Sequence, residues 1–264
     1  MAAVAGIYLV VLLVLWTMQE RITFPAPRAP LPDPEQTLGY GERIELKMQD
    51  GTRLVGWYLP PLGRPSPPIA ALLWFYGNGE TIAAIWPIIR DFRPPHAALL
   101  VLDYPGYGGS GGRATEAGLY EAADLAYQEL IRRSEIDRHR IYVYGRSLGS
   151  AVATHVAATH AVAGMILESP FTSAPAMAAR HYSIFPKALV RLRLDNLGRI
   201  VSIHCPTLIF HGTADRLVPM EMGKQLAAAA AGPVEFVMIG GSGHNDTYDL
   251  GARAYREKIA AFVK

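Results

Sequence analysis

The stretch Ile141–His155, "IYVYGRSLGSAVATH", decides the fold, because it joins a β-branched and aromatic run directly to a run of small residues that favours a helix. Ser147 sits at the junction, between Gly145 and Gly149. Such an abrupt strand-to-helix turn exposes a serine Oγ, and side chains two positions on either side of the serine would collide in it. The stretch therefore predicts a nucleophilic serine at the carboxyl end of a strand.

The same Gly-x-Ser-x-Gly pattern occurs a second time, around Ser110 in "GGSGG" (108–112). Several residues separate Ser110 from the strand that ends near Tyr104, and Arg113 and Ala114 follow before any helix begins, which indicates a flexible loop. From Gly106 the loop also matches the dinucleotide pattern Gly-x-Gly-x-x-Gly, but the next strand does not end in the acidic residue that would hold a ribose. We therefore expect neither a nucleophile nor a dinucleotide site there.

Strand-like and helix-like segments alternate along most of the chain. With 264 residues, 50% of them apolar, the chain is long enough for one large core. Continuously apolar strands that alternate with helices indicate an α/β protein with a mostly parallel sheet covered on both faces. The expected strands are 43–48, 53–60, 69–77, 97–106, 140–145, 164–170, 206–215 and 234–241, and the expected helices are 80–92, 115–133, 150–162, 220–231 and 248–263.

A serine hydroxyl needs a base to take its proton, and the base needs a carboxylate to fix its tautomer. In this topology the expected chain order is serine, acid, histidine, each at the end of a strand. Asp215 follows the strand "PTLIFHGTA", and His244 follows "EFVMIGGSG". Three residue types in the required order predict a catalytic triad of Ser147, Asp215 and His244.

The oxyanion of an acyl-transfer intermediate needs hydrogen-bond donors as well. The turn after Ser147 offers the backbone N–H of Leu148, and the loop after the third strand commonly offers the second donor. That loop reads "WFYGNGET" (74–81), so we expect the N–H of Asn78 to be the second donor.

The remaining polar residues suggest structural roles. Asp195 is expected to hold local structure, Glu168 is a spare carboxylate, and Asp246-Thr247 are expected to cap the last helix. His155 and His160 are five residues apart on one helix, a spacing that does not place both on one face for a metal. The sequence shows no zinc or phosphate-loop signature, so no metal or cofactor is expected.

Charge and cysteine content limit the partners. A net charge of +2 without a long Lys/Arg run gives no electrostatic footprint for nucleic acid. The single cysteine, Cys205, excludes an internal disulfide, and its place before Pro206 indicates a small buried hydrophobe.

The N-terminus differs from the rest of the chain. Ala2–Met18 carries no charge, and as a helix that rises about 1.5 Å per residue it would cross most of a bilayer core. We therefore expect a single-pass membrane anchor over residues 1–21, with a cleaved signal peptide as the rival interpretation; no basic region precedes the apolar run. Residues 22–38 are expected to form a stiff Pro-rich linker, and 39–264 a catalytic domain with a short cap at 171–204. Arg21 and Arg28 are too few to fix the side of the membrane.

The successive motifs "YGNGE", "DYPGYGGSGG", "YGRSLGS", "ESPFTS", "HGTADRLVP" and "GGSGHND" resemble the α/β-hydrolase superfamily from about residue 40 to the end. They are most similar to its membrane-anchored, small-lid serine hydrolases of the bud-emergence type. The resemblance implies an eight-stranded α/β-hydrolase fold and an N-terminal anchor. It assigns Ser147 as nucleophile, Asp215 as acid, His244 as base, and Asn78 and Leu148 as oxyanion donors. It implies an esterase acting on a small-molecule ester or on a lipid such as a lysophospholipid or monoacylglycerol.

Two residues depart from the family pattern. Relatives commonly have histidine at Tyr76 and often arginine at Pro105. A tyrosine at this position resembles the prolyl-oligopeptidase branch, in which a tyrosine hydroxyl supports the oxyanion. This resemblance makes Tyr76 a candidate oxyanion support and a serine peptidase an alternative function. No propeller domain and no acidic pair for a peptide amino terminus accompany it. A catalytically silent binding scaffold is the second alternative, which the complete triad disfavours.

Overall fold

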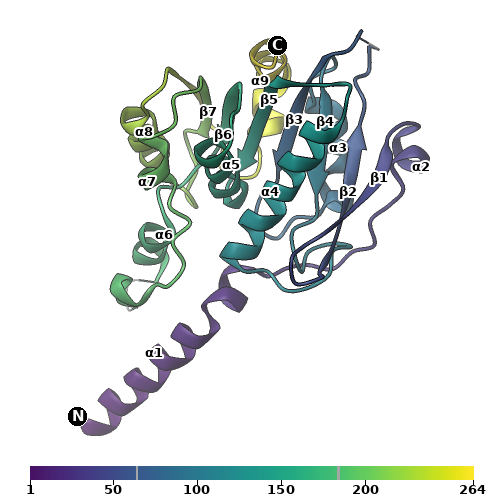
Figure 1. The fold of residues 1–264 in the computed structure, drawn as a ribbon. Coiled ribbons are helices and arrows are strands. Elements are labelled where there is room, and N and C mark those ends of the chain that lie inside the picture. Colours follow the sequence, from purple (N-terminus) through teal and green to yellow (C-terminus); the bar gives the residue numbers. More distant parts are fainter. Residues whose placement is uncertain (64, 183–184) are drawn as a thin grey trace.

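The protein, described by a computed structural model over residues 1–63, 65–182 and 185–264, is built on one eight-stranded sheet. The strand order is β1-β2-β4-β3-β5-β6-β7-β8 (Figure 1). β2 pairs antiparallel with β1 and β4, and all other neighbours are parallel. The strands are β1 (Glu42–Lys47), β2 (Arg53–Leu59), β3 (Ile69–Phe75), β4 (Ala98–Leu102), β5 (Ile136–Arg146), β6 (Gly164–Glu168), β7 (Thr207–Gly212) and β8 (Val234–Ile239).

Helices cover both faces of the sheet, as Figure 1 shows. On one face α4, α5, α7 and α8 contact one another in a row, and on the other α3 contacts α9. The helices are α1 (Ala2–Thr23), α2 (Pro34–Leu38), α3 (Ile82–Phe92), α4 (Glu116–Arg132), α5 (Leu148–Thr159), α6 (Ala174–His181), α7 (Asn196–Ile200), α8 (Met220–Ala229) and α9 (Thr247–Phe262), with a 3₁₀ turn, η1, at Lys187–Leu189. The predicted α/β fold with an eight-stranded, mostly parallel sheet is confirmed.

The central strands owe their continuous apolar sequences to burial on both faces. Every residue of β3, β4, β6 and β7 is buried. A parallel sheet excludes water from both sides, so period-two alternation disappears from these strands. The aromatic rings of Trp74 and Tyr144 meet inside this core with centroids 4.0 Å apart. Because β5, β7 and β8 run parallel, their carboxyl ends reach one edge of the sheet, where ligands of such folds gather.

Helix α1 projects away from the body of the molecule (Figure 1). It is long and apolar enough over Ala3–Thr23 to cross a membrane, and most of that span is not buried by the rest of the chain. The helix ends two residues beyond the expected anchor.

The expected Pro-rich spacer is in fact packed on the domain. Phe24 and Leu31 are buried, and Pro32 accepts a 2.9 Å hydrogen bond from the Trp57 indole N–H. Arg28 donates hydrogen bonds to the carbonyls of Ser110 and Gly112. The spacer interpretation was therefore wrong, because apolar side chains alternate with the prolines and find sites in the domain's surface.

The expected cap, 171–204, contains α6, η1 and α7. Residues 183 and 184 of this segment lie outside the described residues. The cap sits on the same side of the body as α1 (Figure 1).

Candidate active site

Ser147 occupies the turn between β5 and α5 in a strained conformation, with φ 49° and ψ −115°. Positive φ in a residue with a side chain costs of order 1–3 kcal/mol and persists only where the surroundings enforce it. A Cβ on Gly145 would lie 2.2 Å from the carbonyl oxygen of Gly149, and a Cβ on Gly149 would lie 2.1 Å from that of Phe75. Only glycine fits at either position, as the sequence predicted.

The structure brings Ser147, Asp215 and His244 together. The Ser147 Oγ lies 3.0 Å from His244 Nε2, and His244 Nδ1 lies 2.8 Å from Asp215 Oδ2. Asp215 follows β7, and His244 lies in the loop between β8 and α9. The three side chains thus form a continuous chain of hydrogen bonds across three strand ends.

The Asp215 carboxylate is held in its ionised form. Burial alone opposes its ionisation, but hydrogen bonds from His244 and from the Val218 N–H outweigh burial, and the pKa of Asp215 is lowered from its ordinary 3.8. The Leu217 N–H also donates to this carboxylate at 3.0 Å. An ionised Asp215 fixes the His244 Nδ1–H tautomer and leaves Nε2 free to accept the serine proton.

The two expected oxyanion donors both line the cavity in front of Ser147. Leu148 is the first residue of α5, so its N–H has no acceptor within the helix. The Asn78 side chain is fixed on both sides: its carbonyl accepts from the Tyr107 hydroxyl at 2.6 Å, and its amide donates to the Thr23 carbonyl at 2.6 Å. The loop that carries the Asn78 N–H is therefore rigidly held next to the serine.

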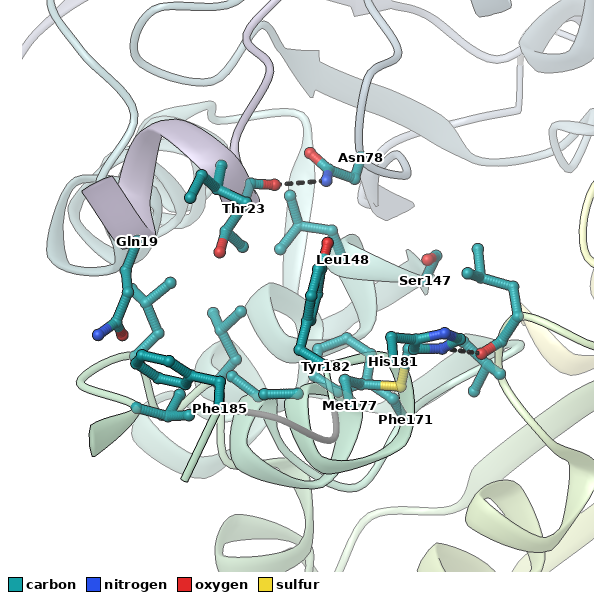
Figure 2. Close-up of a pocket in the computed structure, with 18 of the residues that line it drawn as sticks. Gln19, Thr23, Asn78, Ser147, Leu148, Phe171, Met177, His181, Tyr182 and Phe185 are labelled. Carbon is teal, nitrogen blue, oxygen red and sulfur yellow. Dashed lines mark hydrogen bonds between the residues drawn. The ribbon is translucent and has the colours of Figure 1, made fainter. Parts of the chain in front are cut away.

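A cavity of about 460 Å³ extends from Ser147 between α1 and the cap (Figure 2). Its walls are mainly apolar; among the lining residues are Leu15, Phe171, Met177, Phe185, Leu192 and Leu194. Pockets of this size and character suit a small molecule or one acyl chain.

Comparison with known proteins identifies the fold family. A sequence model of the alpha/beta hydrolase fold matches residues 70–190. Uncharacterized protein Rv2307c of Mycobacterium tuberculosis strain H37Rv is 36% identical over 256 residues, which cover 96% of this chain and 90% of the relative. The chain belongs to the α/β-hydrolase superfamily.

Two further comparisons support this membership. Uncharacterized protein YfhR of Escherichia coli K12 is 28% identical to this α/β-hydrolase chain over 230 residues, which cover 84% of the chain and 80% of the relative. Among solved structures, Pyrococcus furiosus esterase Pf2001 superimposes with a TM-score of 0.74 at 19% identity, covering 90% of this chain and 97% of the esterase. At that identity the likeness shows the fold alone.

Tyr76 does not support the oxyanion in this α/β hydrolase. Its side chain is buried, and its hydroxyl donates to Asp103 Oδ1 at 3.1 Å and accepts from the Tyr104 N–H at 3.1 Å. The ring points into the core because the loop after β3 presents Asn78, two residues on, to the cavity. The interpretation of Tyr76 as a support for the oxyanion was therefore wrong. The peptidase alternative loses the feature that suggested it.

Ser110 is likewise not in a flexible loop. It is fully buried, donates to the Asp103 carbonyl at 2.7 Å and accepts from the Val55 N–H at 3.0 Å. Gly108 in the same loop has φ 49°, and a Cβ there would lie 2.0 Å from Asp103 Oδ2. The glycines of this second motif therefore allow the loop to fold tightly around Asp103.

Arg146, which precedes the serine, has a role that sequence reasoning missed. Its guanidinium contacts Glu80 at 2.5 Å, Glu168 at 3.2 Å and the His244 carbonyl at 2.7 Å. Its side chain is 5% exposed. Arg146 thus joins three segments in one buried network: the loop after β3 that carries Glu80 and the expected oxyanion donor Asn78 (the oxyanion loop), the end of β6, and the loop between β8 and α9 that carries His244 (the histidine loop). A charged residue within an otherwise apolar strand end was the available signal.

His211 is a second histidine beside the acid. It is fully buried at the end of β7, its Nε2–H donates to the Val218 carbonyl at 2.8 Å, and its Nε2 lies 3.6 Å from Asp215 Oδ2. Its Nδ1 has no hydrogen-bond partner among the described residues. Its place four residues before Asp215, in "HGTAD", was the available signal.

The remaining polar residues divide into a confirmed expectation and two corrections. Asp195 holds local structure as predicted, since its carboxylate caps α7 through the Gly198 N–H at 2.8 Å. Asp246 is the N-cap residue of α9, but its carboxylate turns back to the Gly243 N–H at 2.6 Å and steadies the histidine loop. Thr247 donates instead to Glu168.

The two helical histidines also differ from expectation. His155 and His160 both contact Asp124 Oδ1, at 3.0 and 2.8 Å, because α5 ends at Thr159 and His160 has extended backbone angles. Each ring stacks on a tyrosine of α4. Among the described residues, no group of three or more His, Cys, Asp or Glu is placed to hold a metal ion.

Proposed function

We propose that this protein is a serine hydrolase that cleaves carboxylic esters, with lipid-derived acyl esters as the substrate class. The observation that carries the proposal is the hydrogen-bonded Ser147–His244–Asp215 chain at the inner end of an apolar cavity. The same fold is found in the Pyrococcus furiosus esterase Pf2001, and this likeness to an esterase supports the ester class.

In the proposed acylation step, the Ser147 Oγ attacks the ester carbonyl carbon while His244 Nε2 takes the hydroxyl proton. Asp215 stabilises the imidazolium that forms. The former carbonyl oxygen, now negatively charged, accepts hydrogen bonds from the backbone N–H groups of Leu148 and Asn78. When the C–O bond to the alcohol breaks, His244 returns its proton to the leaving alkoxide, and an acyl-serine remains.

In the proposed deacylation step, His244 takes a proton from water as the water oxygen attacks the acyl carbon. The second tetrahedral intermediate uses the same two N–H donors. Its collapse breaks the bond to Ser147 Oγ, which recovers its proton from His244, and the carboxylic acid leaves. No cofactor or metal is needed.

We further propose that residues 1–21 anchor the enzyme in a membrane and that the hydrolase belongs to the small-lid, bud-emergence type. The supporting observations are the apolar helix α1 and the short cap. An acyl chain would then reach Ser147 from the lipid surface. In this assignment 22–38 is a docked linker and 39–264 the catalytic domain.

Hydrolysis of p-nitrophenyl esters from acetyl to palmitoyl by the full chain, in wild type and Ser147→Ala, tests the proposal. We expect Ser147→Ala to lower kcat by about 10⁶, the scale of nucleophile removal in a serine-protease triad. Ser202→Ala is the matched control, because Ser202 is an exposed serine whose hydroxyl donates to the Arg199 carbonyl of its own turn.

Unchanged hydrolysis in Ser147→Ala would reject Ser147 as nucleophile. A wild-type protein that cleaves none of the esters would reject ester hydrolysis, and peptide substrates would be tested next. Cleavage restricted to water-soluble short esters would remove the lipid part of the proposal.

A further inference from the structure

Helix α1 forms part of the cavity wall. Four residues from its last three turns, Leu15, Gln19, Ile22 and Thr23, line the same cavity as Ser147. Figure 2 shows Gln19 and Phe185 at the end of the cavity away from Ser147. The segment proposed as an anchor therefore also encloses the site.

The docked half of α1 is fixed at two places. The buried Gln19 amide donates to the Leu189 carbonyl at 2.8 Å and accepts from the Arg191 N–H at 2.7 Å, which attaches the helix to the cap. At the helix end, the Thr23 carbonyl accepts from the Asn78 amide at 2.6 Å, which attaches it to the oxyanion loop. Paired backbone and amide hydrogen bonds of this kind set both the position and the rotation of α1.

The opposite side of α1 faces away from the domain. Val10 and Leu13 are 60% and 59% exposed, whereas Leu15 is half-buried and lines the cavity. The part of the helix that precedes the cavity-lining residues, residues 2–14, is about 20 Å long at 1.5 Å per residue, against a hydrocarbon core of about 30 Å. If the whole helix crosses the bilayer, its last turns and the cavity beside them reach into the outer part of the hydrocarbon core.

The cavity between these elements suits an uncharged chain. Among the described lining residues there is no Asp, Glu, Lys or Arg. Apolar side chains lead from Phe171 and Met177 near Ser147 to Phe185 near Gln19 of α1 (Figure 2). Burial of a hydrocarbon chain along these apolar side chains is favourable, whereas burial of an unpaired charged group there costs free energy.

We propose that the last turns of α1 close the far end of an acyl-chain subsite, so that the helix which anchors the enzyme also limits the length of the acyl chain. The substrate class is a long-chain acyl ester whose acyl carbonyl meets Ser147 and whose chain runs toward Leu15 and Gln19. This inference rests on the proposed ester hydrolysis and adds a specificity role for α1.

The test is the chain-length profile of p-nitrophenyl ester hydrolysis by the full chain in nanodiscs, for wild type and Leu15→Trp. We expect kcat/KM in wild type to rise about fourfold per methylene until the subsite is filled. Leu15→Trp should shift the optimum to shorter chains, so that kcat/KM for the longest esters falls relative to kcat/KM for acetyl and butyryl esters. The matched control is Leu13→Trp, which adds the same volume on the exposed side of the helix.

Identical profiles for wild type and Leu15→Trp would overturn the proposal, as would an equal shift in Leu13→Trp. Absence of hydrolysis of every ester in the series by wild type would instead reject the proposed function.

A second measurement keeps the subsite testable without hydrolysis. A C16 fatty acid with a terminal diazirine, added to nanodiscs and irradiated, should label Leu192 or Phe185 of the cap, and Leu15→Trp should remove that label while Leu13→Trp retains it. Labels confined to the exposed side of α1 would show that the chain stays in the bilayer and would overturn the inference.

Discussion

At the scale of single residues, His211 has an unusual position for a histidine. It is completely buried beside Asp215, which bears a negative charge. Burial lowers the pKa of His211 from its ordinary 6.5, and the hydrogen bond to Val218 and the Asp215 charge only partly oppose this effect. His211 therefore stays neutral at pH values where an exposed histidine takes up a proton.

This burial predicts a pH-dependent stability. In the unfolded chain His211 recovers its ordinary pKa of 6.5, so below that pH the unfolded state binds more protons than the folded state. The contribution of neutral His211 to the free energy of unfolding is fully present above the pKa of the unfolded state. It is lost as the pH falls toward the pKa of the folded state, at up to about 1.4 kcal/mol per pH unit. Between about pH 7 and pH 5, the free energy of unfolding measured with urea should fall more steeply in wild type than in His211→Gln, which keeps a hydrogen-bond donor for the Val218 carbonyl. Parallel curves would contradict this prediction.

Residue identity and order were enough to predict that Ser147, Asp215 and His244 lie together, because each follows an apolar strand whose carboxyl end reaches the same edge of the sheet. The same reasoning failed for Tyr76. Its neighbours in sequence do not show that Asp103, 27 residues away, captures its hydroxyl. Side-chain direction at a strand end depends on such distant partners, which a single sequence does not reveal.

At the scale of elements, Arg146 connects three segments that must keep their relative positions. It binds Glu80 of the oxyanion loop, Glu168 at the end of β6 and the backbone of the histidine loop. Asn245 accepts a further 2.8 Å hydrogen bond from the same guanidinium. The histidine loop contacts Ser147 through the hydrogen bond between His244 Nε2 and Ser147 Oγ. In the proposed mechanism Arg146, which holds this loop in place, is therefore a positioning residue.

Replacement of Arg146 by methionine should therefore affect both stability and rate. Glu168, completely buried, would lose its cationic partner, and breaking a buried pair costs about 3–5 kcal/mol. A histidine loop displaced by about 1 Å should lower kcat by about 10². The double variant Arg146→Met/Glu168→Gln should recover stability without recovering kcat, measured by thermal unfolding and ester hydrolysis. Full recovery of kcat in the double variant would show that Arg146 acts only on stability.

Elements were predicted well where burial is complete on both faces and poorly where packing is one-sided. The sheet strands and α4 are close to expectation, since long apolar runs and capped helices leave few alternatives. Residues 24–34 look like a spacer by composition, yet Phe24 and Leu31 enter the core. Whether such an apolar residue packs depends on a recess in the domain, which exists only after folding.

At the scale of the whole molecule, α1 and the cap lie on one side of the body (Figure 1). The cap sequence from Phe171 to Leu194 contains four Lys or Arg residues and no acidic residue. Lys187 and Arg193 are exposed. If α1 spans a membrane, this basic surface faces lipid headgroups, and the docked linker keeps it there because residues 24–34 do not allow the body to swing freely.

This arrangement predicts that anionic lipid favours hydrolysis of membrane esters. Lys187→Glu and Arg193→Glu should each lower the rate on a long-chain ester in nanodiscs with anionic lipid by about fivefold or more, since one basic residue near such a surface contributes about 1 kcal/mol. The rate on soluble p-nitrophenyl acetate should not change, and high salt should reduce the difference because it screens exposed charges. Arg138→Glu is the matched control, because Arg138 is an exposed residue of β5 remote from the strand's carboxyl end, where Ser147 follows. Equal losses in Arg138→Glu, or the same losses in uncharged nanodiscs, would show that the cap does not meet the lipid surface.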